Sequence, residues 1–152
     1  MKEHTTNYFD TFIEIAEDCP IDKAEIPPLK GQIKSVANYQ FEMINKNPYK
    51  YTSDDVLFQV FSKRKELLEE EIVTARKEFF SKGQACFRAS PLTKRYAWGL
   101  HCNSEGKIAL VAVGTDKYEK LINDPSIKKY KAMKSKRKVQ FKNRMKTLLM
   151  FL

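Results

Sequence analysis

The stretch that decides the fold runs from Cys86 to Val113 and reads CFRASPLTKRYAWGLHCNSEGKIALVAV. Its second half contains two apolar segments, residues 96–102 and 107–113, joined by Asn103-Ser104-Glu105-Gly106. These four residues are typical of a hairpin turn, because Asn favours turns and Gly accepts a positive φ. We therefore predict two antiparallel strands. The second strand, with its run IALVAV, is apolar on both faces, so we expect it to be central in the sheet and covered on both sides.

The flanking elements follow from apolar periodicity, because a spacing of two indicates a strand and a spacing of three to four a helix. The clearest helix is predicted over residues 65–82, where Leu68, Ile72, Ala75 and Phe79 form an apolar stripe. In chain order, the other predicted elements are a strand over 8–15 near a sheet edge, a loop over 16–31, a helix between Ser35 and Asn47, strands over 56–60 and 87–89, a helix over 117–122 and a further helix after a break at 123–126. Together they predict an α+β domain of two layers, in which a mostly antiparallel sheet of about five strands packs with two or three helices.

The composition is that of a globular chain. With 152 residues, of which 42% are hydrophobic, the chain is long enough to bury a core as one domain. Cys19, Cys86 and Cys102 are far apart and accompany only two His, which fits neither a disulfide framework nor a zinc site. We expect reduced thiols, no metal and no cofactor. No signal-peptide pattern or membrane-spanning apolar run occurs, so we expect a cytoplasmic protein.

The net charge of +9 belongs to the C-terminal segment. Ten of the 28 Lys and Arg residues follow Ile127, where no Asp or Glu occurs, whereas residues 1–127 carry 18 basic and 19 acidic side chains. We therefore predict a nearly neutral α+β domain over residues 1–127 and a basic helical extension over residues 128–152. The overall basicity is no argument for a nucleic-acid site on the domain itself.

Residues 88–101 combine cationic, polar and small side chains. Arg offers paired donors and Lys a point charge, a combination suited to a phosphate or carboxylate group. In a regular strand the small residues Ala97 and Gly99 lie on one face between two larger basic residues, which leaves a shallow strip for a ligand. We therefore predict a binding module for a small anionic ligand, with candidate residues Arg88, Ser90, Lys94, Arg95, His101 and Tyr51.

The alternative for this stretch is purely structural. Tyr96 and Trp98 would then belong to the core, and Gly99 would mark a bulge. The cations would be solvated charges at strand ends that oppose edge-to-edge pairing.

An enzymatic alternative uses His101 as a general base, with Tyr51 or Asp54 assisting. On a strand Asp54 and Asp55 would point to opposite faces, so we interpret them as turn and strand-entry residues. As neighbours on a strand, His101 and Cys102 would also point to opposite faces, which makes them a poor nucleophile–base pair. No phosphate-binding loop, nucleophile elbow or zinc-protease motif occurs in the sequence.

A further alternative is nucleic-acid binding through the basic C-terminal segment. Its candidate residues are Lys128, Lys129, Lys131, Lys134, Lys136, Arg137 and Lys138. Further on, apolar residues recur at helical spacing among basic ones; they are Phe141, Met145, Leu148, Leu149 and Leu152. That pattern also fits a membrane surface, a partner groove, or packing onto the domain.

Three strings carry a resemblance to a known family. They are HTTNYFDTF from His4, NPYKYTSDDVLF from Asn47 and RASPLTKRYAWG from Arg88. With these strings the chain resembles a family of small bacterial proteins of unknown function, from about Lys2 to Arg137. The resemblance implies no activity, ligand or catalytic residue. The apolar segment from about Val139 is an addition to the family pattern.

Overall fold

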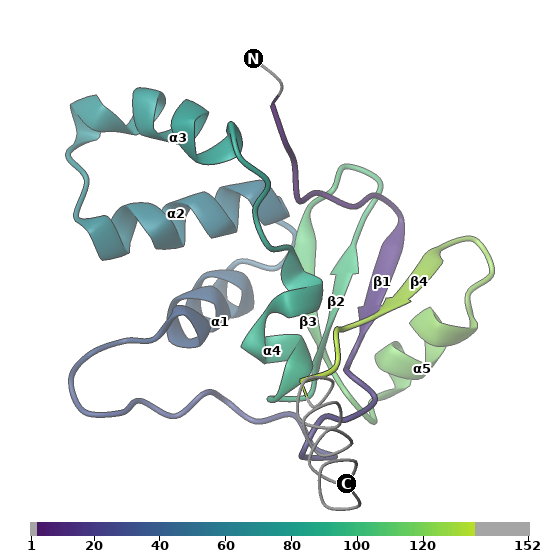
Figure 1. Cartoon of the computed structure of the whole chain (residues 1–152). Helices are drawn as coiled ribbons and strands as arrows, with labels where there is room; N and C mark the ends of the chain where they lie inside the picture. Colours follow the sequence, from purple (N-terminus) through teal and green to yellow (C-terminus); the bar gives the residue numbers. More distant parts are fainter. Residues whose placement is uncertain (1–2, 136–152) are drawn as a thin grey trace, which may run out of the picture.

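A computed structural model describes residues 3–135 of the chain, which form a single sheet with helices around it (Figure 1). The strands are β1 (Thr11–Glu14), β2 (Trp98–Cys102), β3 (Ile108–Ala112) and β4 (Lys128–Lys131), in the order β3-β2-β1-β4. β1 and β3 pair antiparallel with β2, whereas β4 pairs parallel with β1. The predicted α+β class is confirmed. The sheet has four strands instead of about five, and it is mixed.

The predicted hairpin is confirmed as β2 and β3. Leu100 lies opposite Leu110, the Asn103 N–H donates to the Lys107 carbonyl at 2.9 Å, and Gly106 has a φ of 77°. The expectation that this second strand is central is wrong, because β3 forms an edge of the sheet. Part of that edge is closed by residues 49–52, which exchange backbone hydrogen bonds with Ile108.

The position of β1 also differs from the prediction. β1 lies between β2 and β4 instead of near an edge, because Lys128–Lys131 form a strand where we predicted a helix. The four residues of this strand read KKYK, a sequence too polar to indicate a sheet strand on its own. The apolar part of the predicted extension, from Phe141, lies outside the described residues.

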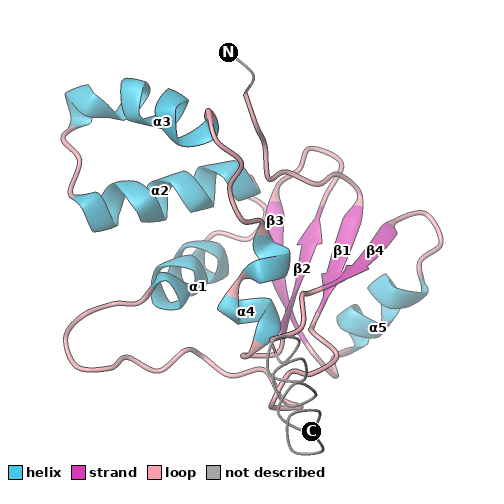
Figure 2. Ribbon diagram, viewed as in Figure 1, coloured by secondary structure: helices cyan, strands magenta, loops and turns pink. Residues whose placement is uncertain are grey.

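Residues 3–135 form five α-helices (Figure 2): α1 (Val36–Lys46), α2 (Ser53–Lys65), α3 (Ile72–Phe80), α4 (Pro91–Lys94) and α5 (Asp116–Asn123). α1 and α5 confirm two predicted helices, and their N-caps are Ser35 and Thr115. α1 and α4 cover one face of the sheet, while α5 covers the other. The structure therefore has three layers, with the sheet between two layers of helices, instead of the two layers that we predicted. Within residues 3–135, no helix has both the length and the apolar character needed to cross a membrane.

The strand predicted over residues 56–60 is wrong, because these residues belong to α2. Thr52 caps this helix with its hydroxyl, which accepts from the Asp55 N–H at 3.1 Å, and the Asp55 carboxylate accepts from the Thr52 N–H in return. Val56 and Val60 face the core beside α1, while Phe58 packs on Phe79 of α3. A helix between two partners carries apolar residues on two sides, and this arrangement mimicked the alternation of a strand.

Two other boundaries are corrected. The helix predicted over 65–82 is interrupted at Glu66, which has a φ of 52°, and resumes as a short 3₁₀ turn over Glu69–Glu71 before α3. The strand predicted over 87–89 is a 3₁₀ turn, Phe87–Ala89. α4 follows it with Ser90 as N-cap and Pro91 at its first position, where a missing N–H has no cost.

The two faces of the sheet have separate cores. On the α1 face the fully buried side chains include Ile13, Leu100 and Ile108. On the α5 face Phe12 packs edge-on against Tyr118 with 4.9 Å between ring centroids. Both rings lie directly over Gly99, where an added Cβ would come within 2.6 Å of Phe12. The predicted strip at Gly99 is therefore filled by the core and does not open to a ligand.

This packing gives a first prediction. Gly99→Ala is expected to lower the free energy of unfolding by about 1–3 kcal/mol, because the new methyl overlaps two aromatic rings. Urea denaturation measures the change. Gly83→Ala is the matched control, since its Cβ would meet nothing closer than 3.9 Å. Equal effects of the two substitutions would contradict the account of this face.

Candidate functional site

The structure disperses the six residues that we predicted as an anion site. Ser90 is buried, and its hydroxyl donates to Gln40 Oε1 at 2.6 Å while capping α4. Lys94 and Arg95 lie at the end of α4, and their side chains make no hydrogen bond to residues 3–135. Tyr51 packs on the α1 face of the sheet, whereas His101 lies on the α5 face. Arg88 and His101 each have their own group of polar and aromatic neighbours, and these two groups are the candidate sites.

The first group, here called the Arg88 cluster, comprises Tyr8, Cys86, Arg88 and Tyr130. The Arg88 Nε donates to the Lys131 carbonyl at 2.8 Å, and its guanidinium lies 5.5 Å from the centroid of the Tyr130 ring. The Tyr8 ring is 5.5 Å from the Tyr130 ring, and its hydroxyl is 3.5 Å from the Cys86 sulfur. Residues from three distant parts of the chain thus form one surface.

The fold explains how these residues meet. The parallel register of β4 places Tyr130 opposite Ile13, on the face that α4 covers. The 3₁₀ turn over Phe87–Ala89 buries Phe87 and leaves Arg88 half-buried beside β4. A further hydrogen bond, from the Met133 N–H to the Arg88 carbonyl at 2.8 Å, fastens the chain after β4 to this turn. The Arg88 cluster is therefore held by backbone contacts on both sides.

The electrostatics of the Arg88 cluster favour an anion. Burial, assisted by the contact with Cys86, raises the pKa of Tyr8 to about 12, so its hydroxyl stays protonated at neutral pH and can donate. The terminal Nη atoms of Arg88 make no hydrogen bond or ion pair with residues 3–135. Arginine is always charged, and no carboxylate belongs to the cluster. The guanidinium therefore keeps two unsatisfied donor groups.

The second group, here called the His101 cluster, comprises Tyr49, His101 and Lys117. The Tyr49 hydroxyl lies 2.8 Å from His101 Nδ1 and accepts a hydrogen bond from the Lys117 ammonium at 2.9 Å. Tyr49 has a φ of 60°, which is unusual for a bulky residue, and its N–H donates to the Ile108 carbonyl at 2.9 Å. The strained backbone thus holds the ring between a cation and an imidazole.

The hydrogen bonds of Tyr49 fit a neutral His101. The Tyr49 hydroxyl accepts from the Lys117 ammonium and can donate its own proton to Nδ1 of a neutral His101, an arrangement in which the imidazole proton is on Nε2. Burial lowers the pKa of His101 and the charge of Lys117 lowers it further, against a smaller opposing effect of Asp10 and Asp124. The ring is therefore held in its neutral form near pH 7.

Tyr51 and Asp54, which we predicted to assist His101 as a general base, do not contact it within the described residues. The carboxylate of Asp54 accepts from the Thr5 hydroxyl and from the Thr6 N–H, each at 2.7 Å, and so fixes the N-terminal segment to the start of α2. Tyr51 faces the opposite side of the sheet from His101. A general-base role for His101 stays a prediction, and its neighbours in the fold are Tyr49 and Lys117.

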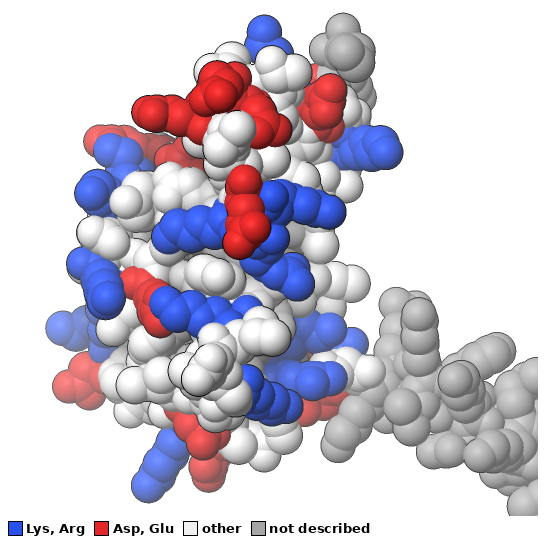
Figure 3. Space-filling model, turned by 90° about the vertical axis from the view of Figure 1, so that its left-hand side faces the viewer, with Lys and Arg blue, Asp and Glu red and all other residues white. Residues whose placement is uncertain are grey.

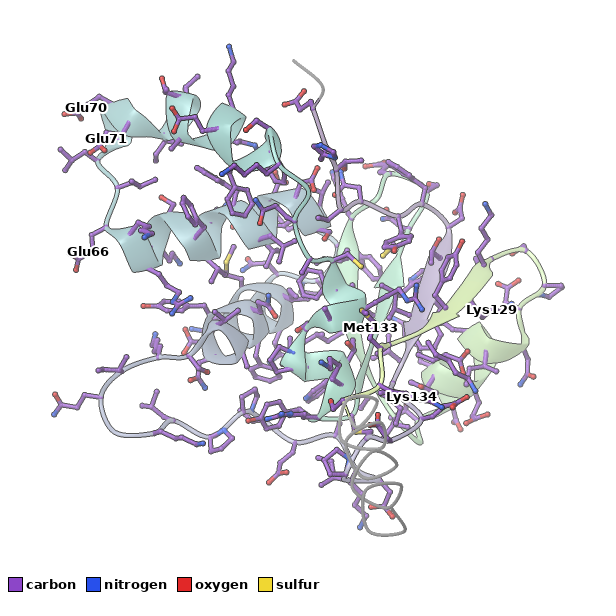
Figure 4. The ribbon with its side chains drawn as sticks, viewed as in Figure 1. Glu66, Glu70, Glu71, Lys129, Met133 and Lys134 are labelled. Carbon is purple, nitrogen blue, oxygen red and sulfur yellow. The ribbon has the colours of Figure 1, made fainter. Side chains whose placement is uncertain are left out.

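The basic residues of the C-terminal segment lie partly on β4. Lys131 and Lys134 both pair with Glu17, at 2.9 and 3.1 Å, and Lys129 donates to the Asp124 carbonyl. Figure 4 shows Lys129 beside β4 and Lys134 in the chain that follows the strand. The pairs with Glu17 are exposed and therefore weak. Lys136, Arg137 and Lys138 lie outside the described residues, and nucleic-acid binding through this segment stays a prediction.

Metal and thiol chemistry gain no support from the arrangement. Among residues 3–135, no group of three or more His, Cys, Asp or Glu side chains is placed to hold a metal ion. Cys102 is fully buried in β2, and burial raises the pKa of its thiol to about 12. Such a thiol is a packing group and a poor nucleophile.

Sequence reasoning found Arg88 and His101 but missed the residues around them. Tyr8 and Tyr49 stand in the quoted HTTNYF and NPY strings, which is the one signal that could have identified them. Lys117 and Tyr130 had no local signal, because they reach the clusters only through the placement of α5 and β4.

Comparison with known proteins places this chain in a family without an assigned role. The chain belongs to the family of unknown function DUF6157, whose model matches residues 3–138. No curated protein and no solved structure matches it. The match confirms the expected membership of a family of unknown function, and it includes both clusters.

A second prediction concerns the pKa of His101. Lys117→Met is expected to raise this pKa, because it removes a nearby positive charge that disfavours the imidazolium. A pH titration of the His101 ring resonances by NMR measures it. Lys120→Met is the matched control, since Lys120 is exposed on the same helix and makes no contact with His101.

The same shift predicts the pH dependence of stability. The unfolded chain binds a proton at His101 more readily than the folded chain, so the free energy of unfolding decreases as the pH falls below the ordinary histidine pKa. In Lys117→Met this decrease should be smaller. An unchanged His101 pKa in that variant would show that Lys117 does not act on the imidazole.

Proposed function

We propose that this chain is a binding module for a small ligand that carries a phosphate or carboxylate group, with Arg88 as its main anchor. One observation carries the proposal. The Arg88 guanidinium is fixed by its Nε hydrogen bond to the Lys131 carbonyl and by its stacking on Tyr130, yet its terminal Nη groups have no partner within residues 3–135.

Guanidinium chemistry supports an oxyanion as the ligand. The planar group presents parallel N–H donors that match the two oxygens of a carboxylate or phosphate, and such charge-assisted pairs are stronger than neutral hydrogen bonds. Because the side chain is already ordered, binding loses less conformational entropy than binding to a free surface arginine. The protonated hydroxyl of Tyr8, beside the same tyrosine ring, is a further donor for the ligand.

The proposal narrows the site predicted from sequence. Of the original candidates only Arg88 belongs to this cluster, whereas Ser90 has a structural role as the cap of α4. His101 lies on the opposite face of the sheet, beside the cation Lys117 but also in the field of Asp10 and Asp124. The cation there, Lys117, already donates to the Tyr49 hydroxyl, and the two carboxylates act against an anionic ligand.

The third prediction tests this proposal by thermal unfolding with a panel of inorganic phosphate, nucleoside monophosphates, sugar phosphates and dicarboxylates. At least one compound is expected to raise the melting temperature in proportion to the logarithm of its concentration. Arg88→Ala should abolish the shift, and Arg88→Lys should weaken binding about tenfold or more, since a point charge replaces paired donors.

Arg64→Ala provides the control, because Arg64 is exposed at the end of α2 and makes no hydrogen bond or ion pair within residues 3–135. It should keep the full shift. The proposal fails if no compound in the panel stabilises the protein. It fails equally if Arg88→Ala and Arg64→Ala respond alike.

A further inference from the structure

The hairpin of α2 and α3 projects from the sheet (Figures 1 and 2). Its side chains line an open groove. The groove has a volume of about 860 Å³. Its apolar lining comes from Phe61 of α2, Phe79 of α3 and Leu67 between them, and the two rings contact each other in a tilted arrangement, with 4.8 Å between centroids. α3 has a single buried residue, Phe80, so the helix leaves most of its surface uncovered.

One large apolar side chain is exposed in the connection between the two helices. Leu68, which follows the lining residue Leu67 in the chain, is 58% exposed. An apolar groove with an exposed apolar side chain beside it is typical of surfaces that bind another chain.

The rim of the groove is mainly acidic. Glu70, Glu71 and Glu78 line it, against Lys65 and Lys82. Figure 3 shows acidic side chains gathered at one end of the molecule, and Figure 4 shows Glu66, Glu70 and Glu71 around the connection between α2 and α3. The carboxylates of Glu70 and Glu78 make no ion pair with residues 3–135, so they are open to a basic partner.

The same chain contains a segment of complementary chemistry. Residues 136–152 carry six basic residues and no acidic ones. Within them the apolar side chains of Phe141, Met145, Leu148, Leu149 and Leu152 recur three to four residues apart. A segment with this spacing can present an apolar stripe flanked by cations, which fits an apolar groove with an acidic rim.

We propose that the groove of the α2–α3 hairpin binds residues 141–152 of a second copy of this chain, so that two chains exchange C-terminal segments in a symmetric dimer. Lys134, one residue before the end of the described chain, lies far from Glu70 and Glu71 of the hairpin (Figure 4), which favours exchange between copies over binding within one chain. In a two-fold dimer both grooves are filled by identical contacts, so the assembly is closed. The family model ends at residue 138 and so does not include residues 141–152.

The fourth prediction tests this dimer with charge reversals in the full chain. Light scattering coupled to size exclusion should give the mass of a dimer for the unmodified protein. Glu70→Lys with Glu78→Lys, and separately Lys142→Glu with Lys146→Glu, should each weaken the dimer at least tenfold. An equimolar mixture of the two variants should restore the dimer, because each basic surface then meets an acidic one.

Combining all four substitutions in one chain should also restore self-association, which a misfolded variant would not do. The control reverses exposed acidic residues on other elements, Asp22→Lys with Glu119→Lys, and should leave the dimer intact. Three results would each overturn the proposal: a monomeric unmodified chain, a Glu70 and Glu78 variant that stays dimeric, or a mixture that does not reassociate. If residues 141–152 bound the groove of their own chain instead, the unmodified protein would be a monomer, which is the first of these results.

Discussion

The rest of the structure depends on the parallel pairing of β4 with β1. Hydrogen bonds from the Lys128 N–H to the Asp10 carbonyl and from the Ala132 N–H to the Glu14 carbonyl, each 2.9 Å, lie at the two ends of this pairing. It makes β1 an inner strand whose adjacent residues Phe12 and Ile13 are both fully buried, on opposite faces. β1 therefore contributes large side chains to both cores of the sheet.

The same pairing positions the Arg88 cluster. Because Tyr130 lies opposite Ile13, its ring projects toward the 3₁₀ turn that carries Arg88, and the Lys131 carbonyl accepts the Nε hydrogen bond. The lysines of β4 stand on a sheet edge, where charged side chains oppose pairing with other chains. The edge strand β4 thus serves two purposes, since its lysines protect the sheet edge and its Tyr130 and Lys131 carbonyl position the arginine.

Elements with strong local signals could be predicted from the sequence. The β2–β3 hairpin had an Asn-to-Gly turn, and α1 and α5 had Ser and Thr caps, so these were found. α2 was mistaken for a strand because its apolar residues serve two partners, although the capping pair of Thr52 and Asp55 was present in the sequence. β4 could not be found, because a polar segment becomes a strand only when β1 offers it a free edge.

The candidate site, like the fold, could be predicted from the sequence only in part. Arg88 and His101 stood out by residue type, but the open strip at Gly99 depended on what lay above it, and the rings of Phe12 and Tyr118 come from distant segments. Likewise, nothing near Arg88 in the sequence indicated Tyr130. Local patterns identify the charged groups, whereas the topology of the sheet decides which of them share a surface.

The central claim is that the pairing of β4 with β1 leaves Arg88 as an ordered guanidinium whose Nη groups have no partner within residues 3–135, and we propose that these groups bind an oxyanion. Side-chain NMR of the arginine Nε–H groups during titration with inorganic phosphate tests this claim most directly. The account predicts a saturable shift of the Arg88 Nε–H and of the Tyr130 ring protons, with no saturable shift at Arg64. Absence of a shift at Arg88, or equal shifts at every arginine, would contradict it.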